Sequence, residues 1–539
     1  MIAEKESFMN GVFALIISQF FIKILGLIYS IYLTNKNGFG DSGNAIYMSG
    51  YQIYALLLTI SSIGVPNAIS KLVSESIAKN DFESANRIFK IAFFIFSIIG
   101  FICTCLLLFG AKFISREILQ IFEAEEILII LSPAIFFVSI SSVIRGYCNG
   151  IQKMFVTAKS QLVEQILKTS LTICIVEIIS LYSKYNTKLM ATGANLATTL
   201  ATIISFIYIF IIYMKIKKQI NVFSYKKIYS DKKSVFFIIK KILKISIPMT
   251  ISSLLASINK NIDSITVVRL LKEKVGEDLA KSKYGILSSK IDTLTVMPLS
   301  FNIAFATALV PSIASSKINN DLEKINEDLK FSILITILIG LPCTIGMFVF
   351  SKQILLLLFP KASEGYYLLK ISSISIIFSV LTQTINGAFH GLGKTNIPAV
   401  ILSFGVITKF ILNILLIPVD SIYESGAVIS SLISQIIIFL ITYCVFKRNI
   451  NLNFNISNII IKPLISTILG VSIGCYLYNF MTQKLKIIEK ISIIVSLLIF
   501  ILTYIFFVII LKVFSKKEIY LFPKGEIIYK ILKKIHIYY

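Results

Sequence analysis

Two lysines lie within apolar stretches of this sequence, where a charged side chain is costly. Lys23 lies in FFIKILGLIYS, near the middle of an apolar run at 10–33, and Lys290 lies in YGILSSKIDTLTVMPLS, with Asp292 close by, near the start of a run at 285–313. Ionisable groups at such depth usually face a cavity or a polar partner, and a lysine ammonium binds phosphate as a point charge. We interpret Lys23 as a cavity residue, with a structural ion pair as the alternative. For Lys290 an interfacial position also fits the spacing.

Three further charges lie in the apolar run at 240–271, within SINKNIDSITVVRLL. Lys260 and Asp263 are three residues apart, so they share one face of a helix, and a local salt bridge is the expected explanation. Arg269 follows in the same segment. We treat all three as candidates for a charge network in a cavity.

The apolar run at 158–182 carries Glu164 and Lys168, which are four residues apart and again predict a local salt bridge. Lys409 repeats Lys168 in the second half of the chain, but Gly405 stands four residues before it. A salt bridge within one helix can therefore account for Lys168 but not for Lys409. Glu164, Lys168 and Lys409 join the candidates for the charge network.

The sequence contains no motif for catalysis or for a metal ion. It has no phosphate loop of the GxxxxGK[ST] kind, no His-Glu zinc motif and no acidic cluster of the DxD type. The seven cysteines show no CxxC spacing, and the two histidines cannot build a metal site alone. We expect no enzyme activity and no cofactor. Coupling to the membrane potential or to Na+ or H+ is left open.

The elements that position these residues are apolar helices. Of the 539 residues, 56% are hydrophobic and 15% are charged, and the mean hydropathy is +0.84. Soluble domains carry about 25% charged residues, whereas runs of about 20 apolar residues cross a bilayer. We predict an all-α polytopic membrane protein with about 14 transmembrane helices. They lie near residues 10–33, 46–70, 88–113, 127–150, 158–182, 189–214, 240–271, 285–313, 329–352, 366–391, 396–419, 424–446, 456–480 and 490–512.

The positions of the lysines orient these helices in the membrane. The net charge of +25 would suit a nucleic-acid partner, but ten lysines lie between Lys215 and Lys244 and seven follow Leu511. Basic loops stay on the cytoplasmic side. We therefore expect a protein of the bacterial plasma membrane, in contact with lipids and not nucleic acid, with both termini in the cytoplasm. The first apolar run is too long for a signal peptide, so we predict a retained first helix.

One short polar corner occurs twice in the sequence. IRGYCNGIQK at 144–153 and INGAFHGLGK at 385–394 share an Ile, two glycines and a Lys. The acidic linkers NDFESANRIFK at 80–90 and NDLEKINEDLK at 320–330 correspond in the same order. The pattern indicates an internal repeat. We interpret the four glycines as the structural hinges of tight turns between helices: Gly146, Gly150, Gly387 and Gly391.

The repeat predicts the organisation of the chain. Six segments in each half is an even number, so the halves have the same orientation, as in a parallel repeat about the membrane normal. The predicted parts are an N-lobe of six helices at 1–214, a basic cytoplasmic linker at 215–244, a C-lobe of six helices at 245–447, two extra helices at 448–512, and a basic cytoplasmic tail at 513–539.

Several stretches resemble the MurJ/SpoVB group of lipid-linked oligosaccharide flippases, within the multidrug/oligosaccharidyl-lipid/polysaccharide exporter (MOP) superfamily. They are GFGDSGNAIYMSGYQIYALLLTISSIGVPNAISK at 38–71, SSVIRGYCNGIQK at 141–153, YGILSSKIDTLTVMPLSFNIAFATALVPSIA at 284–314 and KFILNILLIP at 409–418. The resemblance covers most of the chain, up to the last two apolar segments. Within the group, the sequence resembles the Gram-positive branch.

The resemblance implies two six-helix lobes around a cationic cavity, as in MATE-like proteins, and transport of undecaprenyl-pyrophosphate-linked sugars by alternating access. Lys23 falls where the group has a basic residue in helix 1, and Lys290 falls at an essential basic position of helix 8. Both are therefore expected to bind the headgroup phosphate. Tyr29 stands where the group has a second arginine in helix 1, which leaves the identity of the headgroup open.

The first hypothesis is a flippase that moves a lipid-linked cell-wall precursor, lipid II in the first place, from the inner to the outer leaflet. It would act as a monomer, with the cell-wall synthesis machinery as a candidate partner. Export of another polyprenyl-linked unit, of capsule or teichoic type, is the alternative. A cation-coupled drug antiporter fits less well, because its cavity should carry acids where this chain has Lys23 and Lys290. A membrane glycosyltransferase would need catalytic acids in a large external loop, and the external loops here are short.

Overall fold

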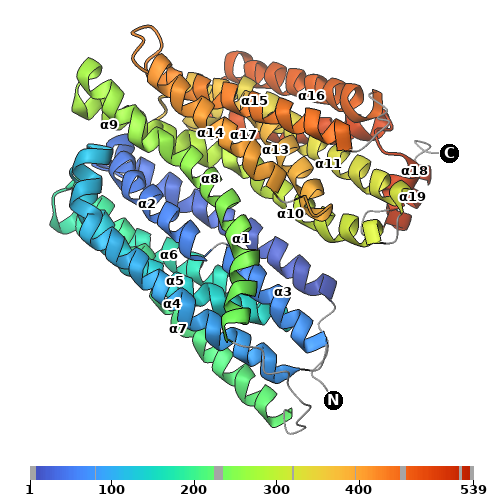
Figure 1. Ribbon diagram of the computed structural model, residues 1–539. Coiled ribbons are helices and arrows are strands. Elements are labelled where there is room, and N and C mark those ends of the chain that lie inside the picture. The colour runs from blue at the N-terminus through green and yellow to red at the C-terminus, as the bar shows by residue number, and fades with distance from the viewer. Residues whose placement is uncertain are drawn as a thin grey trace. The chain divides into compact units, whose positions relative to one another are not determined.

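The computed structural model is helical throughout the residues that it describes, which are 8–62, 64–78, 81–223, 235–318, 321–394, 396–449, 457–520 and 525–534. The chain divides into two compact units. Unit 1 comprises residues 1–293 and 402–427, and unit 2 comprises residues 294–401 and 428–539. Both units consist of long helices joined by short connections (Figure 1).

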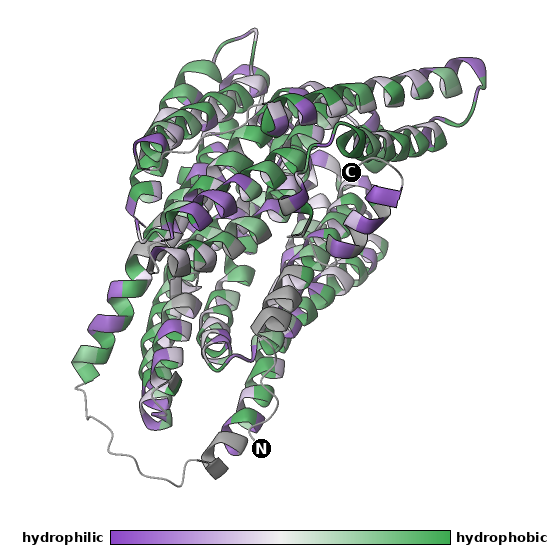
Figure 2. Cartoon of the chain, turned by 90° about the vertical axis from the view of Figure 1, so that its right-hand side faces the viewer, coloured by the Kyte–Doolittle hydropathy of each residue, from purple (hydrophilic) through white to green (hydrophobic). Residues whose placement is uncertain are grey.

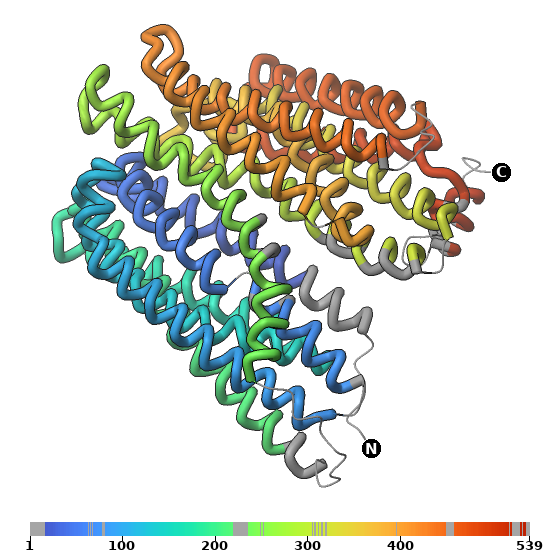
Figure 3. Tube along the Cα trace, in the orientation of Figure 1, coloured from blue at the N-terminus to red at the C-terminus, as the bar shows by residue number. Residues whose placement is uncertain are grey.

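The helices of the first part of the chain lie in unit 1. They are α1 (Phe8–Asn35), α2 (Gly40–Ser62), α3 (Gly64–Ala78), α4 (Phe82–Phe113), the π-helix η1 (Ile114–Leu119), α5 (Ala124–Gly150), α6 (Met154–Tyr182), α7 (Thr187–Phe223), α8 (Val235–Val275), α9 (Glu277–Gly285) and the π-helix η2 (Ile286–Ile291). Figure 3 follows the chain from α4 through η1 into α5, and these two helices pack side by side.

The remaining helices lie in unit 2, except that unit 1 also holds most of α14 and the first turn of α15. They are α10 (Asp292–Ile318), α11 (Leu322–Val349), α12 (Ser351–Leu358), α13 (Tyr366–Gly391), α14 (Asn396–Leu416), α15 (Glu424–Asn449), the π-helix η3 (Ser457–Ile461), α16 (Lys462–Asn479), the π-helix η4 (Phe480–Lys484), α17 (Glu489–Ile510), α18 (Lys516–Tyr520) and α19 (Gly525–Lys534).

Within the described residues, 10 helices are long and apolar enough to cross a membrane. Hydrophobic residues cover most of the length of these helices (Figure 2). The polytopic all-α expectation is thereby confirmed. The other four predicted segments coincide with α2 and α3, α6, α8 and α10. Two of these helices, α6 and α8, carry the candidate residues Glu164, Lys168, Lys260, Asp263 and Arg269.

The predicted segment at 46–70 coincides with α2 and α3. These two helices lie on either side of residue 63, which is outside the described residues.

The acidic linkers of the repeat serve as helix starts. The Asp81 carboxylate accepts a hydrogen bond of 2.9 Å from the Ser84 backbone N–H at the start of α4. Asp321 does the same for Lys324 at the start of α11, at 3.0 Å. An aspartate at the N-cap satisfies a backbone donor that the helix leaves free. The two halves of the repeat thus begin equivalent helices with the same cap.

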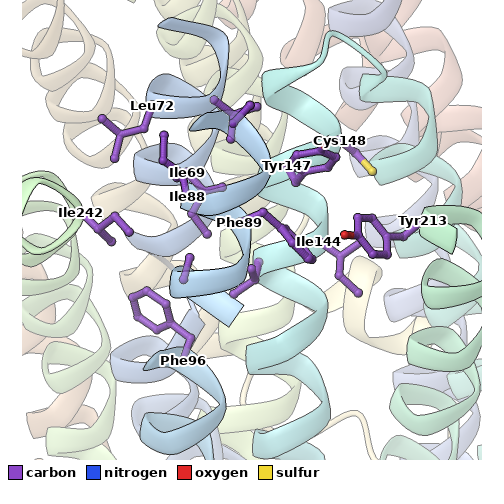
Figure 4. Packing of buried hydrophobic residues seen from close by; sticks show 14 of the residues in the cluster. Ile69, Leu72, Ile88, Phe89, Phe96, Ile144, Tyr147, Cys148, Tyr213 and Ile242 are labelled. Atoms are coloured by element: carbon purple, nitrogen blue, oxygen red, sulfur yellow. The ribbon is translucent and has the colours of Figure 1, made fainter. Parts of the chain in front are cut away.

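An apolar core joins five helices of unit 1 (Figure 4). Phe89 of α4 stacks on Tyr213 of α7, with ring centroids 4.5 Å apart, and meets Tyr147 of α5 edge-on at 5.0 Å. Ile69 of α3 and Ile242 of α8 are fully buried in the same cluster. Of the helices that carry the candidate charged residues, this core includes α8.

The boundaries of the two compact units differ from the boundary between the halves of the predicted repeat. Unit 1 extends to residue 293 and includes 402–427, whereas the repeat places its boundary in the basic linker at 215–244. Of that linker, residues 224–234 lie outside the described residues, as do residues 521–524 and 535–539 of the basic tail. The division into repeat lobes therefore stays a prediction.

Candidate functional site

Lys290 lies in the π-helix η2 and is completely buried. Its ammonium forms an ion pair of 2.9 Å with the Asp41 carboxylate of α2. The neighbouring Ser289 hydroxyl lies 3.4 Å from that of Ser30, which brings η2 against α1 as well. Lys290 is therefore enclosed by the protein, while its depth in the membrane stays a prediction. Lys290 is held inside the protein by a carboxylate that the sequence did not single out.

Lys23 and Lys260 form a contrasting arrangement on α1 and α8. Both side chains are exposed, and neither makes a hydrogen bond or ion pair with another described residue. Their positive charges act on one another, and that of Lys260 also acts on the Asp292 carboxylate. The predicted salt bridge between Lys260 and Asp263 is not formed, because Asp263 has another partner. An exposed ammonium without a carboxylate can bind an anion directly.

The partner of Asp263 is Lys409 of α14. The Lys409 ammonium donates hydrogen bonds to an Asp263 carboxylate oxygen at 2.7 Å and to the Asn259 backbone carbonyl at 2.8 Å. The Asn413 amide donates to the other carboxylate oxygen at 3.0 Å and to the Thr266 hydroxyl at 2.8 Å. The acid that sequence spacing could not find for Lys409 thus comes from a helix about 150 residues earlier.

Glu164 and Lys168 also form no local salt bridge. Glu164 instead accepts a hydrogen bond of 2.7 Å from Arg145, which belongs to the repeated polar corner. Lys168 is buried and points at two aromatic rings, with its nitrogen 4.2 Å from the Tyr51 centroid and 5.2 Å from that of Tyr29. Glu164 and Asp263, the two acids predicted to pair with a lysine on their own helix, thus each pair with a residue of another helix. Tertiary packing therefore determines these ion pairs.

Arg269, the last of the predicted network residues, stands apart from this arrangement. It is exposed near the end of α8, and it makes no hydrogen bond or ion pair with another described residue. The structure therefore does not bring Arg269 together with Lys409 and Asp263. Its position is that of an ordinary charged residue at a helix end.

The four repeated glycines lie where helices approach closely. A Cβ atom at Gly146 would meet the Pro66 backbone at 2.8 Å, and one at Gly387 would meet the Ala306 carbonyl at 2.6 Å. Gly150 and Gly391 meet α3 and α10 in the same way. The left-handed backbone of the turns falls instead at Gln152 and Gly393: their φ angles are 61° and 76°. The glycines thus serve helix packing, which differs from the predicted hinge role.

The helix α9 carries ion pairs that sequence reasoning missed. The Lys281 ammonium is 2.8 Å from Glu123 and 3.0 Å from Glu277. Burial acts to lower the pKa of Lys281, but the hydrogen bonds that it donates to the two carboxylates raise that pKa above its usual value. The hydrogen bond from Lys281 in turn lowers the pKa of Glu277. The pairs hold α9 against the loop before α5.

The same helix is tied to the loop between α14 and α15. Lys283 forms an ion pair of 2.6 Å with the buried Glu424, and Lys274, just before α9, pairs with Asp420 at 2.6 Å. No spacing rule connects residues about 140 positions apart. Asp41 lies in the glycine-rich turn GFGDSG, and Tyr51 lies in the same stretch at 38–71 that resembles the flippase group. Neither pattern predicted that these residues would contact a lysine.

The arrangement can hold anions by charge. In the described ranges, no three His, Cys, Asp or Glu side chains gather as a metal site would require. The chemistry available is that of lysine ammonium groups, some neutralised by carboxylates and others not.

Two family models match the chain. One, described as "Polysaccharide biosynthesis protein", matches residues 8–317, and one described as "MatE" matches residues 248–415. "Stage V sporulation protein B" of Bacillus subtilis is 26% identical over 68% of this chain and 69% of its own. "Lipid II flippase MurJ" of the same organism is 24% identical over 86% of this chain and 87% of its own.

A solved structure of the "Lipid II flippase MurJ, inward closed conformation" superposes with a TM-score of 0.65 and 18% sequence identity, covering 92% of this chain and 98% of that one. This similarity shows the fold. The first family model covers more than half of the chain. The chain is therefore a multi-pass membrane protein of the polysaccharide biosynthesis family, in the MOP superfamily of transporters and not in an enzyme family.

Proposed function

We propose that this protein is a flippase that carries a polyprenyl-pyrophosphate-linked cell-wall precursor, lipid II in the first place, from the inner to the outer leaflet. The observation that supports this most is the pair of exposed, unpaired lysines, Lys23 and Lys260, on apolar helices. The charges of Lys23 and Lys260 act on one another, and although the Asp292 carboxylate lies within electrostatic reach of Lys260, neither lysine forms an ion pair with another described residue, which favours a shared anionic ligand. A cavity for cationic drugs would have the opposite sign.

The physical need for such lysines follows from the substrate. A pyrophosphate that crosses hydrocarbon unpaired loses its hydration at a cost of tens of kcal/mol in the Born limit. Ammonium groups replace that hydration while the polyprenyl tail stays in lipid. The substrate charge would also couple its movement to the membrane potential, at about 2.3 kcal/mol per charge per 100 mV.

Lys290 would join this site only after release from Asp41. The pair is buried, and breaking a buried pair by removing one partner costs about 3–5 kcal/mol. A phosphate that takes the place of the Asp41 carboxylate would offset this cost. In this proposal Lys23 and Lys260 bind the headgroup first, and Lys290 binds it when η2 and α2 separate.

The architecture that we propose is the one predicted from the sequence. Fourteen spans would form two parallel six-helix lobes and two further helices, with both termini in the cytoplasm. The ten apolar helices and the four polar segments at α2–α3, α6, α8 and α10 together account for this number. The relatives named for sporulation and for lipid II transport in Bacillus subtilis support the substrate class.

The experiment is rescue of a bacterium depleted of its own lipid II flippase, with lipid II on the outer face as the readout. The wild type should restore outward lipid II, and Lys23→Ala should abolish it at unchanged membrane abundance. Lys23→Arg should retain more transport than Lys23→Gln, because arginine keeps the charge. Lys188→Ala is the matched control, since it removes an exposed lysine paired with Glu126. Normal transport by Lys23→Ala would contradict the proposal.

A second candidate is export of another polyprenyl-linked glycan unit, which the family description "Polysaccharide biosynthesis protein" favours. It predicts that an abundant wild-type protein fails to restore outward lipid II. Loss of a capsule or teichoic-type polymer on deletion of the gene would then identify the substrate.

A further inference from the structure

Lys168 differs from the other buried lysines in the described part of unit 1. Lys281, Lys290 and Lys409 are each within 3.0 Å of a carboxylate. Lys168 is 6% exposed and has no carboxylate within ion-pair distance. Glu164, one turn before it on α6, is paired with Arg145. A buried cation without a counter-charge is costly, so its persistence calls for a ligand.

Aromatic rings surround the ammonium. Tyr51 and Tyr29 present their faces at 4.2 and 5.2 Å. Tyr47 stacks on Tyr51 with a centroid distance of 5.9 Å and an interplanar angle of 10°, and Tyr54 packs on its other side at 5.6 Å. The quadrupole of an aromatic ring attracts a cation that lies over its face. The rings thus stabilise the ammonium while leaving its charge without a counter-ion.

Two buried hydroxyl groups belong to the residues around Lys168. The Thr172 hydroxyl has no hydrogen-bond partner among the described residues, and the buried Tyr47 hydroxyl has only the Tyr29 side chain beside it and lies within electrostatic reach of Lys168. Thr172 follows Lys168 by four residues, so both lie on one face of α6. A buried hydroxyl without a partner costs free energy. An anion bound at Lys168 could accept hydrogen bonds from these groups.

The cluster reaches the surface of unit 1. Tyr29, Tyr51 and Gln165 are half-buried. A Cβ atom at Gly26 would lie 3.8 Å from the Gln165 amide nitrogen and 3.9 Å from the Tyr29 ring, so these side chains adjoin one another at the edge of the cluster. The edge of the cluster is therefore in part accessible at Tyr29, Tyr51 and Gln165, while Lys168 itself is buried behind them.

We infer that Lys168, with the hydroxyls of Tyr47 and Thr172, binds the pyrophosphate of the transported lipid, and that Tyr29 and Tyr51 hold the ammonium while the site is empty. The inference rests on the proposed function for the identity of the anion. Hydrogen bonds to a charged group are stronger than a cation–π contact. An arriving pyrophosphate therefore draws the ammonium off the rings.

The test titrates inorganic pyrophosphate into the purified full-length protein in detergent, by calorimetry. Lys168→Met should weaken binding by about tenfold or more, since each factor of ten equals 1.4 kcal/mol, and Lys168→Arg should rescue most of it. Lys159→Met is the matched control: Lys159 is an exposed lysine on the same helix, 4.6 Å from the Phe155 ring centroid. Its affinity should equal that of the wild type. Unchanged affinity in a folded Lys168→Met would overturn the inference.

A near-isosteric variant covers the case in which Lys168→Met fails to fold. Thr172→Val should weaken pyrophosphate binding by about threefold at an unchanged melting temperature, which corresponds to less than one hydrogen bond. Unchanged affinity would then count against the site. Farnesyl pyrophosphate in the same micelles should bind more tightly than inorganic pyrophosphate if the source is a lipid; equal binding would indicate a free anion and overturn the lipid assignment.

The outcomes separate the site from the function. Pyrophosphate binding that requires Lys168, together with failed lipid II rescue by the wild type, would retain the site and reject the proposed function. Successful rescue by both the wild type and Lys168→Met would retain the function and reject the site.

Discussion

Lys168 and Lys409 align with one another in the predicted internal repeat, yet their charges meet different surroundings. Lys409 is neutralised by Asp263 at 2.7 Å and is held further by a backbone carbonyl. Lys168 lies against the rings of Tyr51 and Tyr29 with no carboxylate in reach. The repeat supplies a lysine in both places, but the neighbouring helices decide whether that lysine is already paired or remains open to a ligand.

The difference divides the buried cations into two classes. Carboxylate-paired lysines, such as Lys281, Lys290 and Lys409, bind helices to one another, and removing one of them leaves a buried acid unpaired. A ring-held lysine contributes less to stability, because the cation–π contact is weaker and the desolvation cost remains. We therefore expect stability and ligand binding to respond oppositely to mutation at the two repeat positions.

The largest effect should come from Lys409→Met. It removes the ammonium that neutralises the Asp263 carboxylate and leaves the hydrogen bond from the Asn413 amide, and an uncompensated charge costs about 3–5 kcal/mol. The unfolding free energy should fall by about 3 kcal/mol, measured by chemical unfolding in detergent micelles. A smaller loss than in Lys168→Met would remove the basis of the comparison.

Lys168→Met should have the next largest effect on stability, at most about 2 kcal/mol, because only cation–π contacts are lost. The variant also removes the cost of burying the unpaired Lys168 ammonium, which offsets part of the loss of stability. Transport in the rescue assay should nevertheless fall to background. The two measurements together separate a ligand-binding lysine from a structural one: a parallel loss of stability and transport would favour a structural role.

Tyr51 offers a finer test of how Lys168 is held. Tyr51→Phe keeps the ring face and should change the unfolding free energy by less than about 0.5 kcal/mol, whereas Tyr51→Leu removes it and should cost about 1–2 kcal/mol. Both variants can be followed by melting temperature in the same detergent. Equal effects of Phe and Leu would show that the ring face does not hold the ammonium.

The smallest effect concerns pH and the carboxylate-paired class. The pKa of Glu277 is lowered by its hydrogen bond from Lys281, so this pair contributes stability above the unfolded pKa of about 4.3 and loses it as pH falls through the lower folded value. An exposed or half-exposed pair contributes under about 1 kcal/mol. The difference in melting temperature between wild type and Glu277→Gln should therefore be largest near neutral pH and vanish in acid.

At high pH, the stability that the Lys281–Glu277 pair contributes depends on the pKa of Lys281. Its pKa is raised by Glu123 and Glu277, against the effect of burial, so its contribution is full below the unfolded lysine pKa and is lost as pH rises through the higher folded value. A difference between wild type and Glu277→Gln that persists unchanged in acid would contradict this assignment.

Local sequence predicted several parts of the fold well. Apolar runs located the long helices, because a helix in hydrocarbon must satisfy its own backbone and needs an apolar surface. The repeated linkers became equivalent helix starts capped by Asp81 and Asp321. The helix-to-helix corners after Gly150 and Gly391 were also located, although the glycines act in packing.

Local sequence failed where a charge has several helices within reach. The i, i+3 pair Lys260–Asp263 and the i, i+4 pair Glu164–Lys168 were predicted and are not formed. Such local pairs contribute only about 0.2–0.5 kcal/mol, so a better placed partner on another helix replaces them. Arg145 takes Glu164 and Lys409 takes Asp263.

The sequence by itself determined that this is a membrane protein of repeated helices with cations in its apolar segments, because hydropathy and repeat spacing are properties of the chain alone. Only the tertiary structure decided which cations are neutralised: Lys290 by Asp41, Lys409 by Asp263, and Lys168 by no acid but by ring faces. The reason is physical. Electrostatic and cation–π interactions act over a few ångströms in space, and sequence separation does not report that distance.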